Sequence, residues 1–476
     1  MSPPRLLVIL TSLLPGTLCA HSFGRPYQLP MPYWMYIYGA MAALLLSFVV
    51  LAWLLRAERS HQPPPAWSFS PPHCTRLLKP LLQGLMLAGF GLAIASGLLG
   101  SQDSYRNFNM TFFWIVFALG ASYASALLGN WYAALNPWQL LCQGVDTLHA
   151  GFCRGRFSYP QALAYWPALA LYMGFISLEL FADIRPLSLS VWLLIYSAIN
   201  LLATFLWGAR AWFHYGELFA VMFRLMAMMA PLQRDNDNGQ WQLRWPFSGL
   251  LNQRVEHPSL LIFLLFMLSS TAFDGLRETS LWFNLFWADP FGVLSPLLGK
   301  HPLHAYIELR PWYIAYEVLW LLMSPLIYLG LFLLFLWLGK QLVGSALSLR
   351  ELALRFGYSL LPIALVYHIT HYYSLLFSDG IKIRALLSDP FGWGWNLFGN
   401  AITGRVPILL DMGIIWDSQV WLILIGHVAS VYLAHREALR SFNNPRRAAL
   451  SQLPMLLLML LFTGAGLWIL AQPLQA

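Results

Sequence analysis

The sequence YHITHYY at residues 367–373 stands inside a long apolar run that extends from about residue 356 to residue 377. A helix needs about 20 apolar residues to cross the hydrocarbon core of a bilayer, so this run predicts a transmembrane helix. His368 and His371 are three residues apart, and this spacing places both imidazoles on one face of that helix. Ionisable side chains are costly inside a membrane and usually have a partner or a function there. The two histidines are therefore the first candidates for a functional site.

The rest of the chain has the same apolar character. Of its 476 residues, 58% are hydrophobic and only 10% are charged, whereas a soluble domain has about 25% charged residues. The composition therefore predicts an all-α, polytopic transmembrane helical bundle. The net charge of +8 does not indicate nucleic acid as a partner, because no basic run interleaved with aromatic residues accompanies it.

The N-terminus has the pattern of a secretory signal peptide over residues 1–20, with an apolar core at 6–14 and a small residue at Ala20. We expect cleavage after Ala20, which leaves residues 21–476 as a single integral membrane domain. Ten apolar segments follow, and we predict that each crosses the membrane. They are residues 34–55, 77–99, 110–128, 162–181, 187–207, 260–282, 314–338, 356–377, 420–433 and 453–471.

The distribution of Lys and Arg predicts the orientation of these spans. With the mature N-terminus outside, the cytoplasmic segments hold about twice as many Lys and Arg residues as the outer segments. We therefore expect an inner-membrane protein, surrounded by lipid, with both termini on the periplasmic side. On the cytoplasmic side, Asn136-Pro137-Trp138 predicts the start of a helix that Asn136 caps. The Met- and Phe-rich residues 214–229 predict an amphipathic helix at the membrane interface.

This topology places several ionisable residues in the outer half of the bilayer. His368 and His371 lie in the eighth span, and His427 lies at a similar depth in the ninth. Asp274 and Glu179 lie near the outer ends of the sixth and fourth spans. Imidazole and carboxylate are common ligands of transition metals, so we expect His368, His371 and His427 to bind a divalent metal, zinc or copper. The metal would activate water, with Asp274 and Glu179 as catalytic carboxylates.

His21 is a further candidate metal ligand. After cleavage of the leader it would be the first residue of the chain, and its α-amine and imidazole together can chelate an ion such as copper. Each of these residues also has a structural explanation, because a buried histidine can hydrogen-bond a neighbouring helix and an acid near a span end can reach the lipid headgroups. The sequence does not fix which spans are neighbours, so both explanations stay open.

A series of short motifs, in order along most of the chain, resembles bacterial integral membrane proteins known as fenitrothion hydrolases. The motifs are HSFGR at 21–25, LPMP at 29–32, YGA at 38–40, SFV at 47–49, NPW at 136–138, Glu179, GE at 216–217, FDG at 273–275, HYYSLL at 371–376, GHV at 426–428 and LAH at 433–435. The resemblance implies an enzyme that hydrolyses an organophosphorus triester at its phosphorus–oxygen–aryl bond. Such a substrate is small and apolar, and it would reach the site from the membrane or the periplasm.

Other functions fit the same residues. The protein is alternatively a metal-handling membrane protein that captures copper at His21 and passes it to the histidines. It is alternatively a haem protein with one axial imidazole from each of spans eight and nine, or a secondary transporter with a site near the middle of the membrane. The physiological substrate, the metal and any partner subunit are not fixed by the sequence.

Overall fold

The computed structural model describes residues 31–54, 66–70, 74–234, 240–251, 253–401, 404, 406–408, 410–442 and 444–475. Helices make up most of this part of the chain, and three short strands form one small sheet. The predicted all-α membrane bundle is confirmed. The predicted signal peptide at residues 1–20 and the predicted metal ligand His21 lie outside the described residues.

Nine helical segments in the described residues are long and apolar enough to cross a membrane. They match nine of the ten predicted spans. Their elements are α2 Tyr33–Leu54, α3 Cys74–Leu99, the continuous α4 Phe108–Met110, η2 Thr111–Gly120 and α5 Ala121–Leu128, then α9 Pro186–Trp207, α12 Pro258–Arg277, α15 Tyr306–Val343, α17 Leu361–Ser378, α19 Met412–Ser441 and α20 Pro445–Gln475. The span predicted at 260–282 ends at Arg277, because Thr279 caps a new helix, α13 (Ser280–Trp287), and accepts a hydrogen bond from the Trp282 N–H.

The span predicted at residues 162–181 is the exception. Its helix, α8, contains 16 residues, Trp166–Phe181. At 1.5 Å per residue this is about 24 Å, shorter than the ~30 Å hydrocarbon core. Residues 161–165 form turns instead of helix, and Ala164 has a positive φ of 35°. In the described chain, the ten predicted spans therefore correspond to nine long helical segments and this shorter helix.

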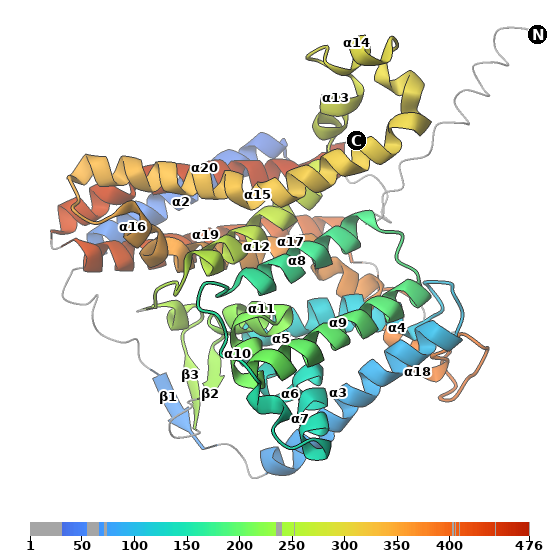
Figure 1. The fold of residues 1–476 in the computed structure, drawn as a ribbon. Helices are drawn as coiled ribbons and strands as arrows, with labels where there is room; N and C mark the ends of the chain where they lie inside the picture. The colour runs from blue at the N-terminus through green and yellow to red at the C-terminus, as the bar shows by residue number, and fades with distance from the viewer. Residues whose placement is uncertain are drawn as a thin grey trace, which may run out of the picture.

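The helices form two groups that lie side by side (Figure 1). In one group α15 packs against α12 and α20, and α19 packs against α2, α17 and α20. In the other group α3 packs against α9, and α5 packs against α11 (Leu218–Ala227). Helix α8 contacts both α12 and α11, and segment η2 contacts α17. These two segments therefore join the groups.

Segment η2 is a π-helix of ten residues, Thr111–Gly120, in the third predicted span. π-Helices are rare, usually one turn long, and often located at functional sites. Their i→i+5 hydrogen bonds change the angular spacing of side chains, so the residues that share a face differ from those on an α-helix. The residues of this span that face the interior therefore do not follow from α-helical periodicity.

The predicted helix start at Asn136 is confirmed. Helix α7 runs from Pro137 to Leu148, and Asn136 Oδ1 accepts hydrogen bonds from the backbone N–H groups of Trp138 and Gln139 at 3.0 and 3.1 Å. Asn136 Nδ2 donates to Glu217 Oε2 at 3.1 Å. Glu217 in turn caps α11, so this contact joins the starts of two helices.

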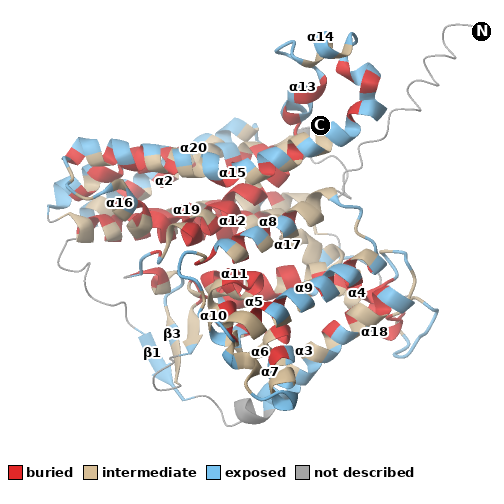
Figure 2. Ribbon diagram, viewed as in Figure 1, coloured by how far each residue is buried: buried red, intermediate tan, exposed pale blue. Residues whose placement is uncertain are grey.

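The prediction that residues 214–229 lie at the membrane interface is wrong. Helices α10 (Ala209–Tyr215) and α11 occupy this stretch, and eight of the ten residues of α11 are buried. Figure 2 shows α11 in the buried interior of the molecule. A helix that is apolar on nearly every side is stabilised by burial among other helices, not by lying at a surface.

The remaining elements connect the spans. They are α6 Tyr132–Leu135, η3 Phe152–Arg154, η4 Ser248–Leu250, α14 Leu294–Leu298, η5 Pro302–Ala305, α16 Leu349–Phe356, η6 Gly357–Leu360, η7 Gly380–Lys382, α18 Ile383–Ser388, β1 Ala66–Phe69, β2 Leu232–Arg234 and β3 Trp241–Arg244. The strands pair antiparallel in the order β1-β3-β2. The sheet lies at one end of the molecule, and α13 and α14 form an arm at the other end (Figure 1).

Candidate functional site

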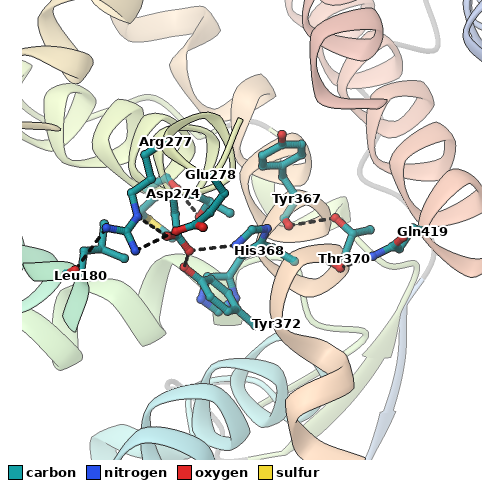
Figure 3. Close-up of polar contacts among 12 residues, drawn as sticks. Leu180, Asp274, Arg277, Glu278, Tyr367, His368, Thr370, Tyr372 and Gln419 are labelled. Carbon is teal, nitrogen blue, oxygen red and sulfur yellow. Dashed lines mark hydrogen bonds and ion pairs between the residues drawn. The ribbon is translucent and has the colours of Figure 1, made fainter. Parts of the chain in front are cut away.

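Asp274, in the last turn of α12, is the centre of a hydrogen-bonded group of side chains (Figure 3). Its Oδ2 accepts hydrogen bonds from His371 Nε2 and from the Tyr372 hydroxyl, each at 2.8 Å. Its Oδ1 accepts one from Arg277 Nε at 3.2 Å. The Asp274 side chain is only 5% exposed. Three donors, one of them a guanidinium, compensate the loss of water around this carboxylate.

Gly275 allows the helices that carry these residues to approach one another. A Cβ atom at this position would lie 2.5 Å from Cγ2 of Ile469 on α20, which is closer than side-chain atoms can pack. The same Cβ would lie 3.7 Å from Cε1 of His371 on α17. The glycine next to Asp274 therefore lets α12 pack closely against α20, with His371 near its backbone.

Arg277 connects this group to α8. Its Nη1 donates to the backbone oxygen of Leu180 at 3.2 Å, and its Nη2 lies 3.1 Å from Oε1 of Glu278. Leu180 is in the last turn of α8, where backbone oxygens have no partner within the helix and a cation is favoured by the helix dipole. Arg277 therefore pairs with carboxylates at the end of α12 and binds the C-terminal end of α8.

A cavity of about 430 Å³ lies next to this group, where the two groups of helices meet. Its walls come from η2, α5, α8, α11, α12 and α17, and its rim includes the exposed residues Ala182 and Asp183 beyond the end of α8. The polar side chains in the lining are those of Ser122, Tyr172, Glu179, Asp183, Ser270, Thr271, His368, Tyr372 and Asp379. Most of the other lining residues are apolar, as is usual for sites that bind small molecules.

His368 lines this cavity from α17. Its ring packs against the rings of Tyr372 and Tyr123, at centroid distances of 5.0 and 5.7 Å. Nδ1 is buried without a hydrogen-bond partner among the described residues. His368 thus differs from His371, whose Nε2 is committed to Asp274.

The two predicted catalytic carboxylates occupy different positions. Glu179 lies in the lining of the cavity, as His368 does. Asp274 is not part of that lining, and both of its oxygens already accept hydrogen bonds. Of the described residues that hydrogen-bond Asp274 through their side chains, Tyr372 is the one that lines the cavity. This geometry suits Asp274 to orienting its neighbours more than to accepting a proton from water.

The three histidines predicted to bind zinc or copper do not form a common site. His371 donates to Asp274, and Nδ1 of His427 hydrogen-bonds the backbone oxygen of Ile423 in its own helix at 2.8 Å. His427 is not in the lining of the cavity that His368 faces. Among the residues that the structure describes, no three His, Cys, Asp or Glu side chains are placed to hold one metal ion. The described residues therefore do not fit the predicted divalent metal.

Sequence reasoning missed Arg277 and Tyr372. Arg277 lies within the span predicted at 260–282, and its spacing of three residues from Asp274 on a helix favours an ion pair. Tyr372 directly follows His371, and a buried tyrosine usually finds a partner for its hydroxyl. Comparisons with protein-family models, with curated proteins and with solved structures found no match for this chain.

Proposed function

We propose that the protein is a membrane-bound hydrolase that cleaves the phosphorus–oxygen–aryl bond of small organophosphorus triesters, such as aryl phosphorothioates of the fenitrothion type. The observation that carries the proposal is the position of His368. This imidazole lines a cavity with both apolar and polar walls and has a ring nitrogen without a partner among the described residues. An imidazole that is free to accept a proton is the commonest general base in enzymes, and the apolar walls suit an uncharged triester.

In the proposed reaction, His368 removes a proton from water while the water oxygen attacks phosphorus. The phosphorus–oxygen–aryl bond breaks, and the aryloxide leaves with the bonding electron pair. His368 then returns the proton, so water and the triester give a phosphorothioate diester and a phenol. Glu179 lines the same cavity, and its carboxylate would stabilise the imidazolium that forms.

The group around Asp274 would position the reacting residues. Asp274 fixes the hydroxyl of Tyr372, and the ring of Tyr372 packs on His368 at a centroid distance of 5.0 Å. A general base must be held within hydrogen-bond reach of the water that it activates. We therefore assign Asp274 and His371 to positioning and His368 to proton transfer.

The expected location is consistent with this function. We propose that the protein lies in a bacterial inner membrane with its mature N-terminus and its C-terminus on the periplasmic side, as the excess of cytoplasmic Lys and Arg indicates. The rim of the cavity at Asp183 then faces the periplasm. Capture of copper at His21 and haem binding by His427 remain untested predictions.

The proposal is tested by the release of nitrophenol from fenitrothion or paraoxon by the purified protein in detergent or nanodiscs. His368→Gln should lower turnover by about 10²- to 10⁴-fold, the usual contribution of a general base. His427→Gln is a matched control, because it changes a buried histidine on the neighbouring helix that does not line the cavity. His149→Gln is a control outside the spans.

Two results would contradict the proposal. The first is full activity of His368→Gln, and the second is the absence of nitrophenol release by the wild-type protein with either ester. Treatment with EDTA should leave turnover unchanged, because no metal takes part in the proposed step. A loss of turnover with EDTA that added zinc or copper restores would instead support the three-histidine prediction.

A further inference from the structure

A second cavity, of about 190 Å³, lies between η2, α8, α9 and α11. Its lining is apolar or aromatic and includes Gly174, Leu178, Trp192 and Ile195. One hydroxyl belongs to the lining, that of Tyr196, and it donates to Glu217 Oε1 at 2.5 Å. The hydroxyl in this lining is therefore already paired, and the other described lining residues contribute apolar and aromatic surface.

This apolar cavity opens on the outer surface of the bundle, between α8 and α9. Trp192 and Ile195 are each 42% exposed, and Ile199 is 37% exposed. Gly174 on α8 is also exposed. Helix α9 is long and apolar enough to cross the membrane. In a bilayer that α9 crosses, the surface around the opening would face the hydrocarbon core.

The apolar cavity and the cavity of His368 share part of their walls. Trp114, Phe175 and Ile184 line both of them. The rings of Trp114 and Phe175 are stacked, with centroids 5.4 Å apart and planes inclined by 28°. Trp114 belongs to the π-helix η2, and Phe175 belongs to the short helix α8. A pair of stacked aromatic rings thus lies between an apolar cavity and the cavity of His368, whose lining also contains polar side chains.

We infer that the apolar cavity is the entrance through which an apolar ester dissolved in the bilayer reaches His368, with the stacked rings of Trp114 and Phe175 as the gate. The inference rests on the proposed function for the identity of the substrate. An uncharged aryl ester concentrates in the hydrocarbon core. When such an ester passes between α8 and α9 it contacts apolar side chains, so its passage does not require a polar side chain to be dehydrated. The rim at Asp183 then serves as the route for water and for the charged diester product.

Gly174 provides a way to block the entrance without disturbing the fold. A Cβ atom added at Gly174 meets no other atom within 4 Å, so Gly174→Phe should fill the apolar cavity instead of displacing a helix. Gly330→Phe is the matched control, because Gly330 is also an exposed helical glycine with open space around it, and it lies on α15 outside both cavities.

The test measures access to the cavity of His368 and does not depend on hydrolysis. Thr271 lines that cavity, and Thr271→Cys introduces a thiol there. The protein in phosphatidylcholine nanodiscs is treated with N-pyrenylmaleimide, which dissolves in the bilayer, or with a quaternary ammonium methanethiosulfonate, which stays in water. Mass spectrometry of the peptide that contains residue 271 gives each rate. Gly174→Phe should slow the maleimide at least 10-fold and leave the charged reagent unchanged, and Gly330→Phe should change neither rate.

Equal maleimide rates in Gly174→Phe and Gly330→Phe would contradict the inference that the apolar cavity is the entrance. Gly174→Phe could also lose a bound phospholipid with no change in the maleimide rate. That result would contradict the inference and identify the apolar cavity as a lipid site. Trp114→Ala should speed the maleimide, because it removes one ring of the gate. If the Thr271→Cys protein and its phenylalanine variants show this pattern of access but the wild-type protein releases no nitrophenol, the proposed function is wrong and the entrance stands.

Discussion

The substitution Asp274→Asn tests whether the group around Asp274 holds the helices together. Asparagine keeps one acceptor oxygen, but its amide nitrogen would face a donor, either Arg277 or the pair His371 and Tyr372. A hydrogen bond to a charged group stabilises a protein by about 1.5–3 kcal/mol, and one between neutral groups by about 0.5–1.5 kcal/mol. With the amide nitrogen toward Arg277, one charged bond is lost, two are weakened and Arg277 is left partly unpaired; with it toward His371 and Tyr372, two are lost and one is weakened. We therefore expect the free energy of unfolding to fall by about 2–4 kcal/mol.

The assay is thermal unfolding in one detergent at one scan rate, followed by tryptophan fluorescence. Asp274→Asn should lower the midpoint by several degrees. Asp183→Asn is the control, because its ion pair with Arg185 joins side chains that are 81% and 69% exposed and should contribute little. A double-mutant cycle with Arg277→Met should give a coupling free energy of about 0.5–3 kcal/mol. Equal midpoints for Asp274→Asn and the wild-type protein would refute the reasoning.

Three further predictions concern stability. Gly97→Ala should lower the thermal midpoint strongly, because the added Cβ would lie 2.1–2.4 Å from atoms of α4 and α9, whereas Gly91→Ala, where the Cβ meets no atom within 4 Å, should not. Asn136→Ala removes the cap of α7 and should cost about 1–2 kcal/mol by the same assay; an unchanged midpoint would refute the role of the cap. Burial and the nearby Arg224 guanidinium lower the pKa of His214, which lies outside the spans. The folded state therefore favours the neutral form of His214. The contribution of neutral His214 to the free energy of unfolding should be complete above about pH 6.5 and should be lost as the pH falls through the lowered pKa. His214→Gln should flatten this part of the midpoint–pH profile, and an unchanged profile would contradict the reasoning.

The sequence predicted the spans well because the thermodynamic signal for them is strong. A run of about 20 apolar residues has few alternatives to a membrane helix, and Asn136-Pro137 is a specific helix start. The bounds were less certain where a local hydrogen bond decides them. Thr279 begins α13 and so shortens the sixth span, and the turns at residues 161–165 shorten α8. The burial of α11 depends on its neighbours, which a single sequence does not reveal.

The site was predicted only in part, because depth in the membrane does not fix position around the bundle. The expectation that Asp274 and His371 lie close together agrees with the structure, and both Glu179 and His368 line the adjacent cavity. His427 has a similar position along its helix but faces a different environment. Rotation of a helix about its axis and the order of helices are set by packing contacts such as those of Gly275. In the π-helix η2 the angular spacing of side chains differs from that of an α-helix, so α-helical periodicity in the sequence does not predict which of its residues face the interior.

The most direct measurement is a cryo-electron microscopy map of the purified protein with a non-hydrolysable aryl phosphonate analogue of the triester. We predict density for the analogue in the cavity between η2, α8 and α17, with a phosphonate oxygen within hydrogen-bond distance of His368. The contact between Asp274 and His371 should be unchanged. An empty cavity together with density for the analogue elsewhere, such as at the arm formed by α13 and α14, would contradict the assignment of His368 as the base.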